Sequence, residues 1–269
     1  MKKTRVLPLL ICGLLAGPAA PAQPLTALET PAQAGSQGTP PPDCGRQTSL
    51  LAYCPTPSDQ GYAASSAAHA IANAMTIRLA FQCRLSGRQK VDRMRFSAAY
   101  IYNQVKQGET CDAGAYLTDG LDLARKQGVC REATFPGSRY ACSRLPGEAE
   151  RREAGRFRIR GYSTIFRLDA GAEDKINATL SALDWNNPVI AGLVVPPTFP
   201  EISPGSYRGQ AAVVVDYDEK KEEFLLMNSY GPDWGEGGFV RMRFEDYGKL
   251  ARYAYIISLG RMDCGLFSE

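Results

Sequence analysis

The spacing of hydrophobic positions changes along the chain, from a helical pattern in the first half to a strand pattern in the second. The alanine-rich run from Ser65 to Leu79 predicts a buried helix, and Leu117 to Lys126 is an amphipathic segment that Gly128 closes. From about Arg156, short runs of β-branched and aromatic residues separated by Pro and Gly predict strands, at 158–165, 188–195, 211–217, 224–228 and 238–244. The pattern indicates an α+β protein.

The start of the chain has a different composition. Residues 1–22 predict a secretory signal peptide, because a basic start precedes an apolar run from Val6 to Leu15 and the small residues Ala20-Pro21-Ala22. Residues 23–43 are rich in Pro, Ala and Gly and predict a tether, which leaves 44–269 as the folded domain. The apolar run is too short to span a bilayer, so we expect export to the periplasm or the extracellular medium without membrane insertion after cleavage.

Charge and cysteine content narrow the function classes. The formal charge of +3 falls to zero when the three basic residues of the signal, Lys2, Lys3 and Arg5, are removed, which argues against a nucleic-acid partner. An exported chain is expected to form disulfides, and an odd number of cysteines leaves at least one thiol unpaired or bonded to another chain. The seven cysteines after the signal are Cys44, Cys54, Cys83, Cys111, Cys130, Cys142 and Cys264, and their connectivity is open. No phosphate loop or metal-ligand cluster is evident, so we expect no cofactor and no metal.

Two motifs in the expected order resemble the papain-like cysteine peptidases. The segment from Met227 to Arg241 reads Met-Asn-Ser-Tyr-Gly-Pro-Asp-Trp-Gly-Glu-Gly-Gly-Phe-Val-Arg and is similar to the family's Asn-Ser-Trp-Gly-x-x-Trp-Gly-x-x-Gly-Tyr-x-Arg. Upstream, Gln60 to His69 resembles Gln-Gly-x-Cys-Gly-Ser-Cys-Trp-Ala-Phe. The resemblance covers about residues 55 to 260. It implies a two-lobed fold with a helical N-terminal lobe, an antiparallel β C-terminal lobe and a cleft between them.

The same alignment implies a degenerate catalytic site. Gln60 matches the oxyanion-hole glutamine, Ser66 stands in the place of the nucleophilic cysteine, Gln210 in the place of the histidine, and Asn228 matches the asparagine that orients the imidazole. The chain's only histidine, His69, falls where the family has a helix-interior phenylalanine and is expected to be a satisfied core residue. Glutamine can serve neither as base nor as acid, so a hydrogen-bonded Ser66–Gln210–Asn228 set would be chemically inert.

A candidate peptide-binding groove follows from further matches. Ala113 and Gly114 fall in a family strip whose backbone pairs with an extended substrate, and the usual disulfide partner of Cys111 is here Ala63. Tyr230 and Trp234 match aromatics that shield the histidine–asparagine bond, and packing is the plainer interpretation of both. The proline-rich loop 195–205 is either a wall of the cleft or, more plainly, a surface loop.

Three functional hypotheses remain. The first is an exported pseudopeptidase that binds a peptide or protein partner through the former substrate groove. The second is an active hydrolase that uses Ser66 with an unidentified base. The third is a structural subunit of an envelope assembly, held by the tether. The first predicts binding that survives Ser66→Ala and fails when the groove is filled. The second predicts activity that Ser66→Ala abolishes, and the third predicts that changes in the groove have no effect.

Overall fold

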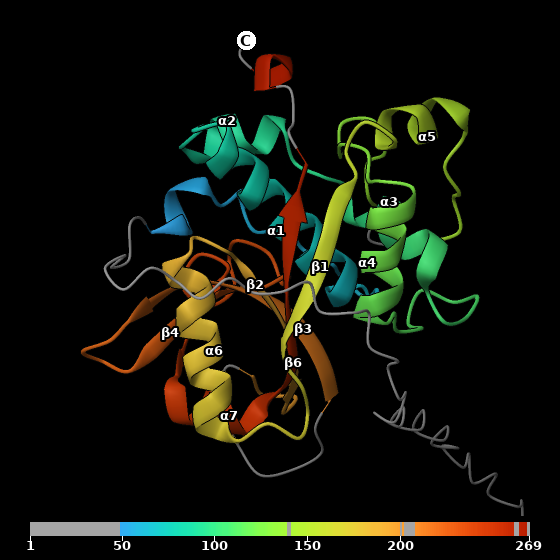
Figure 1. Cartoon of the computed structure of the whole chain (residues 1–269). Helices are drawn as coiled ribbons and strands as arrows, with labels where there is room; N and C mark the ends of the chain where they lie inside the picture. The colour runs from blue at the N-terminus through green and yellow to red at the C-terminus, as the bar shows by residue number, and fades with distance from the viewer. Residues whose placement is uncertain (1–48, 139–140, 200, 202–207, 261–263, 268–269) are drawn as a thin grey trace, which may run out of the picture. The chain divides into compact units, whose positions relative to one another are not determined.

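The chain folds into a helical part followed by a part built on one antiparallel sheet (Figure 1). The computed structural model describes residues 49–138, 141–199, 201, 208–260 and 264–267. The predicted signal peptide, 1–22, and the predicted tether, 23–43, lie outside the described residues. Helices and strands both contribute, which confirms the predicted α+β class.

Helix α1, Ser66–Gln82, is the central element of the helical part. It contacts helices α3 (Ala98–Val105) and α4 (Leu117–Lys126) and also strand β3 of the sheet. Because it is covered by other elements along most of its length, it is apolar around most of its circumference rather than along one stripe. The other helical segments of this part are η1 (Leu50–Tyr53), α2 (Arg88–Arg93) and α5 (Glu148–Ala154).

The end of α4 confirms the prediction made from its glycine. Gly128 has φ of +85° and donates its N–H to the carbonyl of Leu123 at 3.2 Å, which terminates the helix in a left-handed turn. A Cβ at this position would lie 1.9 Å from the carbonyl oxygen of Ala154. Only glycine therefore allows the chain to pass this close to the end of α5.

The sheet has six strands in the order β1-β6-β2-β3-β4-β5, and every neighbouring pair is antiparallel. The strands are β1 (Ile159–Phe166), β2 (Val189–Val195), β3 (Arg208–Asp218), β4 (Glu223–Met227), β5 (Phe239–Arg243) and β6 (Ala251–Leu259). The five predicted strands are present with ends shifted by no more than three residues. Strand β6 was not predicted, and it joins β1 to the rest of the sheet.

Two helices interrupt a region that the sequence pattern assigned to strands. Helix α6, Ala172–Asp184, precedes β2, and helix α7, Phe244–Leu250, precedes β6 (Figure 1). Acidic residues in the first turn of each helix, such as Glu173 and Glu245, are the sequence signal that indicates a helix start here. The strand pattern from Arg156 onward therefore gave no indication of these two helices.

The sheet core depends on one close approach between strands. β2 is buried along its whole length, and its Gly192 pairs with Tyr253 of β6. A Cβ on Gly192 would lie 2.2 Å from the Tyr253 ring. The missing side chain thus makes room for a tyrosine within the sheet.

The expected disulfides are present. Cys83 pairs with Cys264, and Cys111 pairs with Cys142. Among the described cysteines, Cys54 and Cys130 are free thiols, and both are buried. Burial raises the pKa of both thiols, to about 12 for Cys130, so they stay protonated and unreactive at neutral pH. Within the described residues, no helix combines the length and apolar character that crossing a bilayer requires.

Candidate functional site

Ser66 is the first residue of α1, at the point where the helix meets the sheet. Its hydroxyl accepts a hydrogen bond from the backbone N–H of Ala211 on β3 at 3.2 Å. Ser65, the residue before it, makes no side-chain capping bond, so the first-turn N–H groups lack that partner. The helix start therefore presents a hydroxyl and backbone donors next to β3.

Gln210 lies on β3 directly before the residue that contacts Ser66. Its side chain is buried, and its Nε2 donates to Oδ1 of Asn228 at 2.7 Å. Asn228 follows β4, the strand that pairs with β3, so strand pairing brings the two amides together. Asn228 Nδ2 is buried without a hydrogen-bond partner among the described residues. The structure thus joins Gln210 to Asn228, whereas Ser66 bonds the β3 backbone rather than the Gln210 side chain.

Gln60 is held against the segment that follows β4. Its backbone N–H donates to the Ser229 carbonyl at 2.8 Å, and its Oε1 accepts from the Ser229 hydroxyl at 2.5 Å. Its Nε2 donates to the carbonyl of Ala63 at 2.7 Å. An amide nitrogen has two hydrogens, so one N–H of Gln60 is left for a bound group. The side chain is positioned before any ligand arrives.

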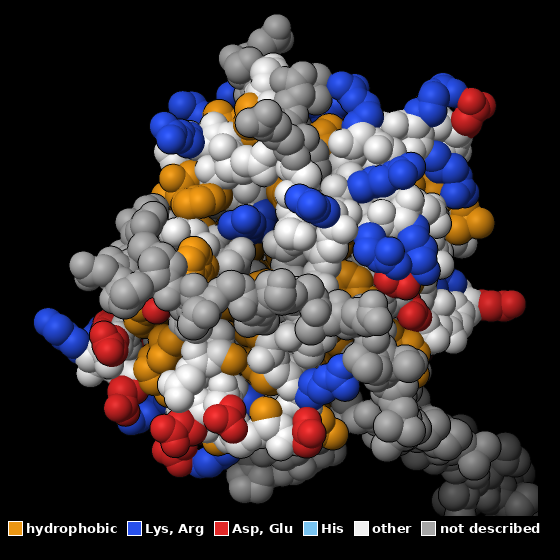
Figure 2. All heavy atoms as spheres, viewed as in Figure 1, with side chains coloured by type: hydrophobic (Ala, Val, Ile, Leu, Met, Phe, Trp, Pro, Cys, Tyr) orange, Lys and Arg blue, Asp and Glu red, His pale blue; other side chains and the backbone are white. Residues whose placement is uncertain are grey.

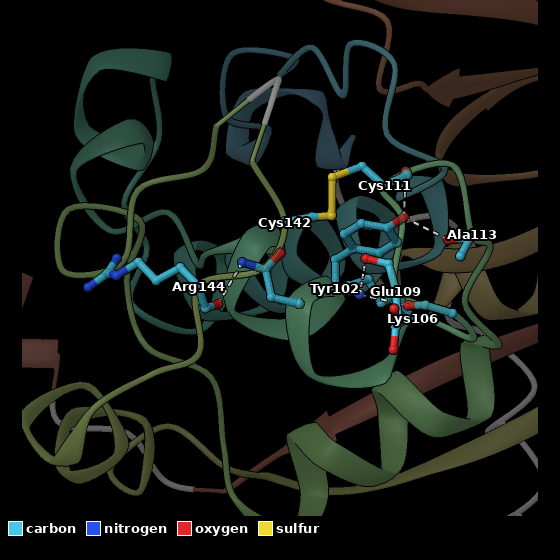
Figure 3. The surroundings of a disulfide bond; sticks show 9 residues. Tyr102, Lys106, Glu109, Cys111, Ala113, Cys142 and Arg144 are labelled. Atoms are coloured by element: carbon cyan, nitrogen blue, oxygen red, sulfur yellow. Dashed lines mark hydrogen bonds between the residues drawn. A yellow bond between two sulfur atoms is a disulfide. The ribbon is translucent and has the colours of Figure 1, made fainter.

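The segment from Cys111 to Gly114 is held by the loop that precedes Ser66 and by two contacts that Figure 3 shows, with Tyr102 and with Cys142. The Tyr102 hydroxyl lies 2.7 Å from the Cys111 carbonyl and 2.6 Å from the Ala113 carbonyl, as the dashed lines in Figure 3 mark. The backbone N–H of Ala64 also donates to the Cys111 carbonyl, at 2.8 Å. The disulfide to Cys142 holds the same segment from another side. This strip is therefore a fixed edge beside Ser66.

Aromatic side chains cover the region after Asn228. Tyr230 meets Trp234 edge-on at 5.3 Å between ring centroids, and Phe199 stacks on Trp234 at 5.6 Å. Arg208 donates to the Tyr230 hydroxyl at 3.2 Å. Within the described part of the loop 195–205, Phe199 is buried, so this loop packs against the aromatic pair. Residues 200 and 202–207 of this loop lie outside the described residues.

His69 lies one turn further along α1, and its side chain makes no hydrogen bond with Ser66. Its Nδ1 is 2.8 Å from the hydroxyl of Ser58. Burial lowers the pKa of His69 from 6.5 to about 4, and the positive charge of Arg95 lowers it further, while Asp59 opposes both. The imidazole is therefore neutral at pH 7. Some of its surface stays accessible because it borders a cavity.

These features can be compared with known proteins. The family model described as papain family cysteine protease matches residues 58–256. The chain belongs to the papain family of cysteine proteases. It is 26% identical over 201 residues to an uncharacterized peptidase C1-like protein of Acanthamoeba polyphaga mimivirus, an alignment covering 70% of this chain and 64% of the viral protein. It is 29% identical over 140 residues to cathepsin B-like cysteine proteinase 3 of Ostertagia ostertagi, covering 44% of this chain and 80% of that protein.

Solved structures of this family share the fold. Xylellain, a cysteine protease from Xylella fastidiosa, superposes with a TM-score of 0.63 at 22% identity, covering 81% of this chain and 92% of that one. Digestive procathepsin L 3 of Tenebrio molitor gives a TM-score of 0.60 at 19% identity, covering 77% and 67%. The predicted papain-like fold, with its helical part and antiparallel sheet, is confirmed. The chain spans less than two thirds of the mimivirus relative, so activity and partners do not transfer from that protein.

The sequence analysis missed one polar pair in this papain-family chain, Ser58 and His69. The two residues are 11 positions apart and meet only because the segment before Gln60 folds back along α1. No spacing rule links a loop serine to a helical histidine, so the sequence carried no signal for the contact. Among the described residues, no group of three His, Cys, Asp or Glu side chains forms a metal site.

Proposed function

We propose that this papain-family chain is an exported pseudopeptidase, which has lost proteolysis and binds a peptide or protein partner through the former substrate groove. The observation that carries the proposal is the hydrogen bond from Gln210 to Asn228, in the place where the family resemblance implies a histidine. The hydroxyl of Ser66 meets a backbone N–H, and no ionisable side chain among the described residues hydrogen-bonds to it.

The chemistry of such a site explains the loss of catalysis. A serine hydroxyl is almost entirely protonated at neutral pH and needs a positioned base to attack a carbonyl. An amide supplies neither a base for the attack nor an acid for the leaving group. The one histidine of the chain is bonded to Ser58 instead. Loss of a triad base removes about 10⁴-fold or more in rate, leaving the contribution of binding and the oxyanion donors.

The groove keeps features that suit a bound peptide. The carbonyl of Gly114 accepts from Gln107 at 2.9 Å, which fixes the strip, while the Gly114 N–H makes no hydrogen bond with any described residue. An extended peptide pairs with free backbone groups of this kind. The spare N–H of Gln60 offers a second donor near Ser66. These donors support a peptide ligand.

Surface charge supports a protein partner rather than a nucleic acid. The face in Figure 2 carries both signs, with acidic side chains gathered over the region of α6 and α7 and basic ones over the helical part. A nucleic-acid site would need a continuous basic surface. The two disulfides and the secretory pattern of residues 1–22 support export to the periplasm or the extracellular medium.

The catalytic half of the proposal is tested with fluorogenic peptides and esters. The mature protein and Ser66→Ala are expected to show equal background hydrolysis. A Ser66→Cys/Gln210→His variant should exceed that background by at least about 100-fold, because it restores a nucleophile and a base. Turnover by the unmodified protein that Ser66→Ala abolishes would establish the rival hypothesis, an active Ser66 hydrolase.

The binding half is tested with a random peptide library displayed on phage. The mature protein is expected to enrich a peptide family that Gly114→Arg no longer retains, because the new side chain fills the groove. Gly260→Arg is the matched control, since a Cβ at Gly260 meets no atom within 4 Å. Equal enrichment by both variants would reject groove binding and favour a structural subunit of an envelope assembly.

A further inference from the structure

A row of arginines lies where the chain enters β1, an edge strand of the sheet. Arg156, Arg158 and Arg160 are exposed, whereas the residues between them, Phe157 and Ile159, are buried. Burial that alternates in this way means that the three arginine side chains leave the backbone on the solvent side. Along extended backbone, such as that between Arg158 and Arg160, side chains on one side recur about every 7 Å. We call these three residues the arginine row.

The arginine row has no counter-charge of its own. None of its guanidinium groups forms an ion pair or a side-chain hydrogen bond with a residue that the structure describes. Figure 2 shows basic side chains over β1 and α4, on the face where the row begins. The row therefore presents three positive charges to solvent with no acidic partner among the described side chains.

The carboxylates of the two helices that end beside the row are already paired. The ends of α4 and α5 meet the start of β1, because the Val129 N–H donates to the Phe157 carbonyl at 3.3 Å and the Phe157 N–H donates to the Ala154 carbonyl at 2.8 Å. Asp122 of α4 pairs with two cations of its own helix, at 3.3 and 2.8 Å. Glu153 of α5 pairs with Arg131 at 2.8 Å. An acidic partner for the row must therefore come from another molecule.

The geometry of the row favours a polypeptide as that molecule. Arginine holds a carboxylate through two parallel hydrogen bonds, and carboxylates at alternate positions of an extended peptide recur about every 7 Å, as the arginines do. A nucleic acid would need a longer basic surface. The predicted tether, 23–43, contains only two acidic residues, Glu29 and Asp43, which are 14 positions apart, so it does not offer such a pattern.

We propose that the arginine row is a docking surface for an extended acidic segment of a partner protein, in which acidic residues alternate with others. Each carboxylate of the segment pairs with one guanidinium group of the row. The row is separate from the groove, because β6 and β2 lie between β1 and β3, the strand that carries Gln210. A partner could therefore contact both surfaces or the row alone.

The proposal is tested by NMR titration of the mature protein, at low salt, with the capped peptide Glu-Ser-Glu-Ser-Glu. The largest shifts are expected at the backbone amides of residues 156–160. Gln-Ser-Gln-Ser-Gln, which lacks the charges, should bind at least about 5-fold more weakly, since each exposed ion pair contributes up to a few-fold in affinity. The isomer Ser-Glu-Glu-Glu-Ser should bind about 3-fold more weakly, because its middle carboxylate points away from the row.

Two double variants separate the row from net charge. Arg158→Gln/Arg160→Gln should weaken binding of the alternating peptide by at least about 5-fold. Arg93→Gln/Arg243→Gln is the matched control, because it removes two exposed arginines from α2 and from β5, the opposite edge of the sheet, and it should change binding by less than about 2-fold. Gly114→Arg should leave this binding intact, so failure here is distinct from failure of the groove proposal.

Four results would overturn the proposal. They are equal loss of binding in both double variants, equal binding of the charged and neutral peptides, equal binding of the two charged isomers, and no shift at residues 156–160 with about 10 mM peptide. Stronger shifts of the same amides by a polyphosphate chain than by the peptide would assign the row to a polyanion, which also contradicts it.

Discussion

Mild acid should destabilise this protein through one side chain, His69. Its pKa falls from 6.5 to about 4 in the fold, mainly because burial disfavours the charged imidazolium. The unfolded chain therefore binds the proton more readily than the folded chain over this range. The stabilising contribution of the neutral ring is fully present above pH 6.5 and is lost as the pH falls toward 4.

The magnitude follows from linkage between protonation and folding. With these two pKa values, the His69 term lowers the free energy of unfolding, relative to pH 7, by about 1 kcal/mol at pH 5.5 and by about 2 kcal/mol at pH 4.5. It approaches a limit of about 3 kcal/mol well below pH 4, since one pKa unit corresponds to about 1.36 kcal/mol. Losses of this size are a large fraction of a typical domain's stability.

Urea unfolding at pH 7.0, 5.5 and 4.5, with the disulfides intact, measures the effect. Carboxylates also titrate in this range, so the useful quantity is the difference between the wild type and His69→Gln, in which that contribution cancels. Glutamine keeps a hydrogen-bonding group near Ser58 but takes up no proton. The wild type should lose about 2 kcal/mol more than the variant between pH 7.0 and 4.5. Parallel pH profiles, differing by less than about 0.5 kcal/mol, would refute a buried neutral His69.

Three further predictions concern stability and are each checked by urea unfolding. Replacing both Cys111 and Cys142 by Ala should lower the free energy of unfolding by about 4 kcal/mol, because their disulfide spans a sequence separation of 31 residues; a loss below about 1 kcal/mol would contradict this. Gly128→Ala should lower it by about 3 kcal/mol or more, since its Cβ meets a backbone carbonyl at a positive φ. Gly192→Ala should lower it by about 1–3 kcal/mol through the tyrosine ring opposite, whereas Gly260→Ala, with open space around its Cβ, should be nearly neutral.

The sequence predicted elements whose signals are local. Helix α4 begins and ends where its apolar spacing and Gly128 indicate, and the five predicted strands lie where β-branched residues are flanked by Pro and Gly. Helix α6 was missed because the region after Arg156 was interpreted only from its runs of β-branched and aromatic residues. Glu173 and Asp174 in the first turn of α6 are the local signal of a helix start. Strand β6 was missed although its tyrosines and isoleucines carry the same local signal as the predicted strands; only its place between β1 and β2 depends on long-range pairing.

In the candidate site, too, the sequence indicated the residues but not the contacts that depend on long-range packing. Family motifs indicated Ser66, Gln210 and Asn228, and strand pairing explains why the last two meet. No motif indicated that the Ser66 hydroxyl would bond the Ala211 N–H, because that contact depends on how α1 lies against β3. The cavity beside His69 was also beyond prediction. It arises from the packing of segments far apart in sequence, since residues 58–69, 98–103 and 132–142 all line it.

Helix α1 directs Ser66 toward β3 and His69 toward Ser58. This separation limits which residue could act as a base for Ser66. Ser66 and His69 are three residues apart, so they lie on nearby parts of the helix surface, yet one contacts β3 and the other contacts Ser58. Moving the imidazole to Ser66 would break the Ser58 contact and withdraw His69 from the cavity. A base for Ser66 must therefore come from β3, where Gln210 already lies beside Asn228. The Gln210→His half of the restoration variant supplies that base without disturbing His69, so turnover should return while the contact between His69 and Ser58 is kept.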